Sequence, residues 1–230
     1  MKISVIVPCH NEASLVEMTY KKIKSVLQRH GYDYEIVLEE DGSTDETGAI
    51  IRDIAKHDKK VRALSFPSSR NGKGWGFKKL VEAASGDILI SMDADLSVSP
   101  EVIPFMIKEM KNADILLTDR YSHRDSKIPK RRFIPSRIYN FMLRLMFGIR
   151  SKDTQSGFKA YRRETFKKIS LKTDGFAYDI ELLAKAYKAG LIVKEIPVKY
   201  LYRQDARFSV KKHGPKMVLN TIRLWRDMKM

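Results

Sequence analysis

Short apolar runs alternate with amphipathic segments of helical periodicity through the first half of the chain, and this alternation limits the possible folds more than any other feature. Runs typical of strands lie at residues 3–7, 35–38, 61–66 and 87–92, and the predicted helices between and after them end near residues 30, 56, 84 and 112. A further strand is predicted at 114–118. Strict alternation of this kind is typical of a parallel sheet covered by helices on both faces. We therefore predict an α/β fold.

Acidic residues gather where the predicted strands end. The loop 39–45 follows the second strand and contains Asp41 and Asp45, while Asp93-Ala94-Asp95 follows the fourth strand. Because ligands of open parallel sheets bind beyond the carboxyl ends of the strands, we expect the loops after residues 7, 38 and 92 to form one crevice. Carboxylates two residues apart in an extended segment face the same side, and two such ligands suit Mg²⁺ or Mn²⁺ together with substrate phosphates. Turns with helix-capping aspartates are the alternative for both loops.

Two further loop features have only local interpretations. Thr44 or Asp45 is expected to cap the helix that follows the second strand. The glycine-rich segment 71–76, which is expected to precede the third helix, lacks the spacing of a Walker loop, so we infer from it only flexibility near a ligand.

The charge balance requires an anionic partner. The chain has 44 Lys and Arg against 28 Asp and Glu, a net charge of +16, which suits nucleic acid, an anionic membrane or a phosphorylated small molecule. The single Cys9 excludes a disulfide framework and a cysteine cluster for a metal. No apolar run approaches the roughly 18 residues that cross a bilayer, and Pro8 interrupts the first run. We therefore expect a cytoplasmic chain without a spanning helix.

The strongest concentration of cations lies at residues 120–152, where ten Lys and Arg accompany a single acid, Asp125. Within it, apolar residues recur at helical spacing over Ile138–Ile149, and a similar basic amphipathic segment covers 215–230. Cations beside an amphipathic helix suit an anion that carries a long apolar tail. A solvated basic face over an ordinary core helix is the alternative, and the last segment could equally be core, oligomer contact or membrane anchor.

Several motifs, taken in their order along the chain, resemble the family 2 glycosyltransferases of the GT-A fold: Pro8–Glu12, Glu40–Asp45 and Asp93–Asp95. Four later motifs are similar to those of polyprenyl-phosphate (dolichyl-phosphate) mannosyl- and glucosyltransferases: Asp119–Tyr121, Asp153–Lys159, Asp179–Leu183 and Glu195–Val198. The resemblance covers nearly the whole chain. It implies a GT-A catalytic domain at 1–210, with a nucleotide-sugar half at 1–118 and an acceptor half at 119–210, followed by a basic amphipathic helix at 211–230.

The resemblance also assigns expected roles to individual residues. It implies that the donor nucleotide sugar is bound by Pro8, Glu12, Asp41, Asp93, Ala94, Asp95, Arg120, Arg203 and Arg207, with Asp93 and Asp95 as ligands of Mg²⁺ or Mn²⁺. It implies that Arg132 and Ser136 contact the acceptor phosphate, and that sugar hydroxyls or the site's supporting contacts involve Asp153, Gln155, Asp179 and Glu181. Two departures from the family pattern are Ser97, where mannosyl-transferring members commonly have Gln, and Asp205-Ala206, where a Gly-Ser pair is usual.

The activity implied is an inverting, metal-dependent transfer of mannose or glucose from GDP-mannose or UDP-glucose to polyprenyl or dolichyl phosphate, at the cytoplasmic face of an anionic membrane. A phosphate monoester is largely ionised near neutral pH, with a second pKa of about 6, so no protein base is needed. Catalysis would then rest on Asp95, Arg120 and Arg132 through positioning and charge.

Other functions remain open at this point. A family 2 enzyme with a soluble or polysaccharide acceptor and, more remotely, a nucleotidyltransferase are the alternatives among enzymes. A basic nucleic-acid-binding protein is the alternative of another class. We expect no nucleic-acid partner, because the aspartates at the strand ends would repel a polyanion. The donated sugar and the oligomeric state cannot be predicted from these residues.

Overall fold

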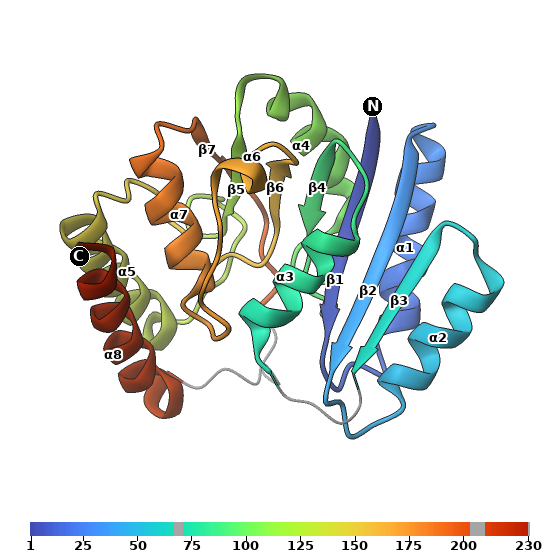
Figure 1. Ribbon diagram of the computed structural model, residues 1–230, viewed down its shortest axis with the longest axis horizontal. Helices are drawn as coiled ribbons and strands as arrows, with labels where there is room; N and C mark the ends of the chain where they lie inside the picture. Colours follow the sequence, from blue (N-terminus) through green and yellow to red (C-terminus); the bar gives the residue numbers. More distant parts are fainter. Residues whose placement is uncertain (67–70, 203–209, 230) are drawn as a thin grey trace.

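The computed structural model describes residues 1–66, 71–202 and 210–229, and a seven-stranded sheet runs through its centre (Figure 1). The strand order is β3-β2-β1-β4-β6-β5-β7. The strands are β1 Lys2–Cys9, β2 Asp33–Asp41, β3 Val61–Phe66, β4 Ile88–Ser91, β5 Ile115–Asp119, β6 Lys159–Arg162 and β7 Val193–Pro197. The α-helices are α1 Val16–Arg29, α2 Thr47–His57, α3 Lys73–Ala83, α4 Ile103–Glu109, α5 Lys130–Phe147, α6 Thr165–Lys168, α7 Tyr178–Lys188 and α8 Val210–Lys229. Two short 3₁₀ helices, η1 Pro100–Val102 and η2 Met110–Asn112, flank α4.

All the sheet pairings are parallel except those of β6. β6 runs antiparallel to both of its neighbours, with Lys159 opposite Ser91 of β4 and opposite Leu117 of β5. The start of β6 therefore lies at the same edge of the sheet as the carboxyl ends of β4 and β5. This edge is the lower one in Figure 1.

Side chains alternate across the sheet and divide the core into two layers. Val5 and Leu38 face the layer that contains buried residues of α1, α2 and α4. Ile6 and Val37 face the opposite layer, which contains buried residues of α3, α5 and α7. Because each strand contributes to both layers, the nearly continuous apolar character of β1 and β4 follows directly from their central position. The predicted α/β fold is confirmed.

The end of β2 differs from the prediction. The strand continues to Asp41, and the pairs Cys9↔Glu40 and Asp41↔Phe66 extend the ladders on either side of it. Residues 39–41 are therefore strand and not loop, because backbone pairing with two neighbours outweighs the poor strand propensity of acidic residues. The following helix begins at Thr47, whose amide donates to Asp45 Oδ1 over 3.0 Å.

The glycine-rich segment also differs from the prediction. α3 begins at Lys73, so Gly74 and Gly76 lie inside the helix and do not precede it. A Cβ atom at Gly74 would lie 2.4 Å from the carbonyl oxygen of Thr173, and one at Gly76 would lie 2.6 Å from Glu39 Oε1. The glycines are therefore required by close packing of α3 against its surroundings.

Helices α5 and α8 lie side by side at the left edge of the molecule in Figure 1. The hydroxyls of Tyr139 and Thr221 are 2.6 Å apart, and the indole N–H of Trp225 donates to the carbonyl oxygen of Met146 over 2.7 Å. Both helices begin earlier than the apolar stripes predicted at 138–149 and 215–230. Trp225 thus contacts α5. Within the described part of the chain, no helix is both long and apolar enough to cross a membrane.

Candidate functional site

The carboxyl edge of the sheet contains a small cavity of about 40 Å³ between the ends of β4 and β5 and the start of β6. Asp93, Asp95 and Arg120, three of the residues expected in the donor site, line this cavity together. Its remaining lining residues are Met92, Ser97, Val98, Ser156, Gly157, Phe158 and Tyr200. Of the three loops that were expected to form one crevice, only the loop after β4 lines this cavity.

The segment after β4 is fixed by two hydrogen bonds, one from α1 and one within the segment. The hydroxyl of Thr19 donates to the buried carbonyl oxygen of Ala94 over 2.6 Å, and the amide of Ser97 donates to Asp95 Oδ1 over 2.9 Å. Leu96 between them has φ +56°, a left-handed conformation that is strained for a residue with a branched side chain. The two aspartates are thus presented by a constrained turn that other elements hold in place.

Asp93 is surrounded by cations and packed against a glycine. Its Oδ1 lies 2.9 Å from the ammonium of Lys73 at the start of α3. Burial by itself would raise the pKa of Asp93, but Lys73 and, more weakly, Arg120 and Lys159 outweigh it and hold the pKa below its usual value. A Cβ atom at Gly157 would lie 1.7 Å from Asp93 Oδ2, so the carboxylate occupies the space that any larger residue would fill.

The cavity suits a hard divalent cation. Ser97 lines it, and the buried Ser97 Oγ has no hydrogen-bond partner among the residues that the structure describes, which is a costly state for a hydroxyl. Together with Asp93 and Asp95 it offers oxygen ligands of the kind that Mg²⁺ and Mn²⁺ prefer. No cluster of three or more His, Cys, Asp or Glu residues that could hold a metal occurs among the described residues. Further ligands would therefore have to come from water or from a bound substrate.

Arg120 is held rigidly beside the two aspartates. Its Nε and Nη2 donate to the two carboxylate oxygens of Asp153 over 2.6 and 2.7 Å, and its guanidinium lies 5.2 Å from the ring centre of Tyr200. Burial would lower the pKa of Arg120, but the Asp153 carboxylate outweighs it and raises the pKa, so the cation is retained. Because Asp153 is only 1% exposed, its carboxylate is fixed in place and orients the guanidinium of Arg120.

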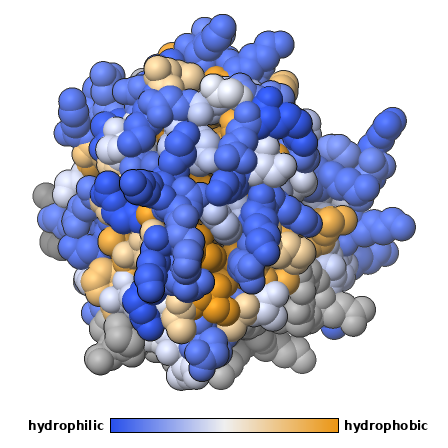
Figure 2. Space-filling model, turned by 90° about the vertical axis from the view of Figure 1, so that its right-hand side faces the viewer, coloured by the Kyte–Doolittle hydropathy of each residue, from blue (hydrophilic) through white to orange (hydrophobic). Residues whose placement is uncertain are grey.

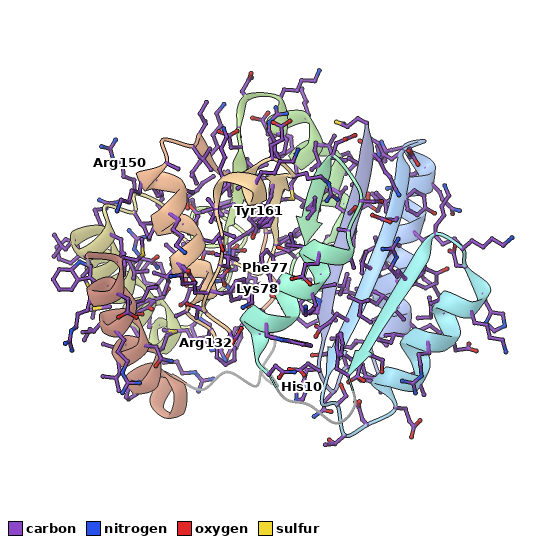
Figure 3. The ribbon with its side chains drawn as sticks, in the orientation of Figure 1. His10, Phe77, Lys78, Arg132, Arg150 and Tyr161 are labelled. Carbon is purple, nitrogen blue, oxygen red and sulfur yellow. The ribbon has the colours of Figure 1, made fainter. Side chains whose placement is uncertain are left out.

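The two residues expected to contact the acceptor lie on α5. The guanidinium of Arg132 is 5.0 Å from the ring centre of Tyr202, and Ser136 Oγ accepts a hydrogen bond of 2.6 Å from the hydroxyl of Tyr121. Tyr121 directly follows Arg120, which lines the cavity. The side chain of Tyr121 therefore links Ser136 to a residue of the cavity lining. Figure 3 shows Arg132 and His10 on the same lower side of the molecule, where the carboxyl ends of β1 and β2 lie.

The residues expected to hold the nucleoside lie at the ends of β1 and β2, outside the lining of the small cavity. Asp41 Oδ2 accepts from the amides of Asn71 and Gly72 over 2.6 and 2.9 Å, which ties the end of β2 to the start of α3. Pro8 pairs with Glu39 in the sheet, and the amide of Glu12 donates to Thr47 Oγ1 over 2.7 Å. Contact of these residues with a nucleoside stays a prediction.

The remaining expected residues have protein partners. Asp179 forms a buried ion pair with Lys159, and Glu181 accepts from the amides of Lys172 and Thr173 over 2.9 and 2.8 Å. Gln155 Nε2 lies 3.0 Å from the sulfur of Met217. These contacts fit the supporting role that was one of the two alternatives for this group. Arg203 and Arg207 lie outside the described residues.

Three residues near the cavity were not singled out from the sequence. Lys73 contacts Asp93, Gly157 packs against it, and the ring of Tyr200 lies beside Arg120. Gly157 belongs to the motif 153–159, which was quoted only as a whole. Nothing in the sequence indicates that Lys73 contacts Asp93 or that Tyr200 lines the cavity, because each residue is distant along the chain from the residue it contacts.

Glu39 is the unusual buried group near the site. It is 3% exposed, and its Oε1 lies against Gly76 of α3 and has no hydrogen-bond partner in residues 1–66, 71–202 and 210–229. Burial raises the pKa of Glu39 from 4.5 to about 8, and the charges of Asp41 and Glu40 add to the increase. The carboxyl is therefore neutral in the folded protein at neutral pH.

This protonation predicts how stability depends on pH. Because the unfolded chain loses the Glu39 proton near pH 4.5 and the folded chain near pH 8, the free energy of unfolding should fall as pH rises through this window. The slope due to this group is at most about 1.4 kcal/mol per pH unit. Glu39→Gln should remove the slope and be more stable than the wild type at pH 9, as measured by denaturant unfolding at several pH values.

Glu35 on the same strand is the matched control. Burial would raise its pKa, but hydrogen bonds from Ser4 and Ser85 outweigh it and lower the pKa to about 2. Glu35→Gln should therefore be less stable than the wild type at neutral pH. This effect is opposite in sign to the one expected for Glu39→Gln. Parallel pH profiles for the wild type and Glu39→Gln would contradict the assignment of a neutral Glu39.

Comparison with known proteins adds evidence from outside the chain. The family model described as "Glycosyl transferase family 2" matches residues 4–170. Glycosyltransferase AglD of Haloferax volcanii is 28% identical over 98% of this chain and 37% of that protein. Dolichol-phosphate mannosyltransferase of Pyrococcus furiosus is 34% identical over 100% of this chain and 64% of that protein. Polyprenol monophosphomannose synthase of Mycolicibacterium smegmatis is 27% identical over 87% of this chain and 77% of that protein.

The chain thus spans between about a third and two thirds of the length of the first two relatives. Among solved structures, glucosyl-3-phosphoglycerate synthase of Mycobacterium tuberculosis matches with a TM-score of 0.69 and 24% identity over 95% of this chain and 80% of that one. Its complex with Mn²⁺, UDP-glucose and phosphoglyceric acid matches with a TM-score of 0.71 and 21% identity over 97% and 79%. This likeness confirms the predicted GT-A fold.

Proposed function

Because the chain belongs to glycosyl transferase family 2, we propose that it transfers a hexose, mannose or glucose, from a nucleotide-diphosphate sugar to a polyprenyl or dolichyl phosphate. The relatives named for transfer of mannose to dolichol phosphate and polyprenol monophosphate support the acceptor class. The single observation that carries the proposal is the shared lining of one cavity by Asp93, Asp95 and Arg120. GDP-mannose and UDP-glucose are the candidate donors.

A divalent cation fits this reaction. Asp93 and Asp95, with the hydroxyl of Ser97, which has no partner within the described part of the chain, are the residues that would hold Mg²⁺ or Mn²⁺. Such an ion supplies charge neutralisation for the departing nucleoside diphosphate. A solved structure of the same fold contains Mn²⁺ and UDP-glucose, which supports this choice of metal and the class of donor.

The protein's own residues position charge. Asp153 fixes the guanidinium of Arg120, so a cation faces the cavity before substrate arrives and needs no reorganisation during the reaction. Arg132 and Ser136 on α5 would direct the acceptor phosphate. One phosphate oxygen of the acceptor forms the new bond to the anomeric carbon, and the bond to the diphosphate oxygen breaks with its electron pair leaving on the nucleoside diphosphate. A single displacement of this kind inverts the anomeric configuration.

No protein base is required for this step, since a phosphate monoester with a second pKa of about 6 is already ionised at neutral pH. The acceptor also places the reaction at a membrane surface, because its chain is a long apolar tail. We therefore expect the protein to act at the cytoplasmic face of a membrane as a peripheral protein.

The test is a transfer assay with the full chain, a polyprenyl phosphate, Mg²⁺ or Mn²⁺, and a panel of radiolabelled nucleotide sugars. Label from one donor should move into organic solvent, and removal of the metal with EDTA should stop it. The control acceptor is the polyprenol without its phosphate, which should receive no label. Transfer of label to a soluble saccharide in place of the lipid, or equal transfer to the free polyprenol, would contradict the proposal.

A further inference from the structure

The motif Glu195–Val198 begins on β7, which stands at one end of the strand order, and Glu195 is partly buried there. The strand at the other end is β3, and the face of the molecule over β3, α1 and α2 shows mostly hydrophilic side chains (Figure 2). A charged residue on an end strand ordinarily serves to keep that strand solvated. Glu195 differs, because its carboxylate makes contacts within the protein.

Glu195 holds the segment between α5 and β6. Its Oε1 accepts hydrogen bonds from two successive amides, those of Lys152 over 2.7 Å and Asp153 over 3.0 Å. Asn140 of α5 fixes the next residue, since its Oδ1 accepts from the amide and the hydroxyl of Thr154 over 3.3 and 2.8 Å. The backbone at Asp153 is therefore held from both sides, by β7 and by α5.

This segment carries the carboxylate that orients Arg120. Asp153 Oδ2 accepts from the amide and the Nε of Arg120 over 3.1 and 2.6 Å, and Asp153 Oδ1 accepts from Nη2 over 2.7 Å. Arg120 directly follows β5, and Leu117 of β5 pairs with Glu195 in the sheet. Hydrogen bonds thus run from Glu195 through Asp153 to Arg120, which lines the cavity.

The cost of placing a carboxylate at this position argues against a role in packing alone. Burial raises the pKa of Glu195 above its usual value, the amides of Asp153 and Lys152 oppose this, and the charges of Asp119 and Asp153 add to the increase. An apolar side chain would fill the same space without that cost. The two amides, however, need an acceptor. The contact that the carboxylate makes therefore explains its presence better than the space it fills.

We propose that Glu195 is a positioning residue for sugar transfer, which sets the guanidinium of Arg120 by fixing the backbone of Asp153. The part that concerns transfer rests on the proposed function. In that reaction Arg120 faces the departing diphosphate, and a charged group stabilises a transition state best when it is already fixed in place. A displacement of about 1 Å in such a group can lower the rate on the order of 10²-fold. Glu195 therefore acts on catalysis without contacting substrate.

Exchange of the Arg120 Nε–H with solvent, followed by NMR of the full chain, tests the positioning without any substrate. The signal is assigned by its absence in Arg120→Lys. Glu195→Met keeps a side chain of similar length but removes both carboxylate oxygens. In this variant the proton should exchange at least about tenfold faster, because the carboxylate that accepts it is no longer fixed. Glu195→Gln keeps an oxygen acceptor for the two amides, so its exchange rate should stay close to that of the wild type.

Transfer assays with the same variants test the consequence for the reaction. Glu195→Met should lower kcat roughly 10- to 100-fold with a smaller change in the KM for the donor, because Arg120 acts on charge that develops in the transition state. Glu195→Gln should recover most of that loss. In an Arg120→Met background, Glu195→Met should cause no further loss, since a residue that acts only through Arg120 has nothing left to position.

Asp114→Ala is the matched control. Asp114 precedes β5, and its Oδ2 accepts from the amide of Ile192, which precedes β7, over 2.8 Å. This carboxylate–amide contact joins the same two strands at the opposite edge of the sheet, so its loss should lower stability but leave Arg120 exchange and kcat unchanged. Thermal unfolding checks that each variant is folded. If Glu195→Met does not fold, Glu195→Asp, which keeps the charge but is one methylene group too short to hold both amides, replaces it in both measurements.

The outcomes separate this inference from the proposed function. Wild-type Nε–H exchange in Glu195→Met would overturn the positioning role, and so would a loss of transfer that is equally large with and without Arg120. A wild-type chain that transfers no sugar from any donor would contradict the proposed function alone. Faster exchange in Glu195→Met, but not in Asp114→Ala, would then still support the contact from β7 to Arg120.

Discussion

Changing Asp95 to asparagine should lower the rate of sugar transfer on the order of 10²–10³-fold, the size of effect seen when one charge-stabilising group is removed from an active site. Asparagine keeps the shape of the side chain but removes the negative charge that would hold a divalent cation. Asp95 Oδ1 also accepts the amide of Ser97, a contact that the amide oxygen of asparagine can keep. The loss should therefore appear in transfer and in Mn²⁺ affinity while thermal unfolding stays close to that of the wild type.

Asp87→Asn is the control for Asp95→Asn. Asp87 precedes β4 at the opposite edge of the sheet, where its carboxylate accepts from the amide of Lys2 over 2.8 Å. Both variants remove one negative charge next to the same strand, but only Asp95 lines the cavity. An Asp95→Asn protein with wild-type transfer and Mn²⁺ affinity would show that the metal is held elsewhere.

Replacing Gly157 with alanine should lower the rate of sugar transfer on the order of 10²-fold. The mutation leaves Asp93 itself unchanged but should displace its carboxylate. The added Cβ would lie 1.7 Å from Asp93 Oδ2 and 2.3 Å from Cγ, so the carboxyl group must rotate away. Because the clash falls on the end of a side chain and not on backbone, the fold can survive while Asp93 leaves the cavity. Transfer assays and Mn²⁺ titration by calorimetry should both record the loss.

Gly175→Ala is the matched control for Gly157→Ala, because a Cβ atom at Gly175 meets no atom of the described residues within 4 Å apart from its own chain neighbours. It adds the same methyl group in the same half of the chain and should leave transfer unchanged. Wild-type Mn²⁺ affinity in Gly157→Ala would mean that Asp93 can move without cost and that its observed position does not define the metal site.

The sequence predicted the first half of the sheet well and missed strands in the second half. β1, β3 and β4 are each made up mostly of apolar residues, and local pattern is sufficient to find them. β6, in contrast, contains only four residues, and it begins with Lys159. A buried lysine is tolerated there because Asp179 of α7 neutralises it, and a partner 20 residues away is a property of the tertiary structure.

The candidate site was predicted in part for the same reason. Family likeness predicted one site for Asp93, Asp95 and Arg120, and the three residues line the same cavity, while their contact with a donor stays a prediction. Family likeness did not distinguish residues that line the cavity from residues that orient a neighbouring side chain. Asp153 is the clearest case, because its role as the partner of Arg120 depends on an ion pair between residues 33 positions apart.

The reversed direction of β6 has a consequence for engineering this protein. The chain enters β6 at the carboxyl edge of the sheet, next to the small cavity. It leaves β6 after Arg162 at the opposite edge, where Arg163 donates to the carbonyl oxygen of Gly86. Length changes on the two sides of this one strand are therefore not equivalent. A peptide tag grafted ahead of Gly157 would remodel the chemistry, whereas one grafted just beyond Arg163 would test only how well the scaffold tolerates extra length.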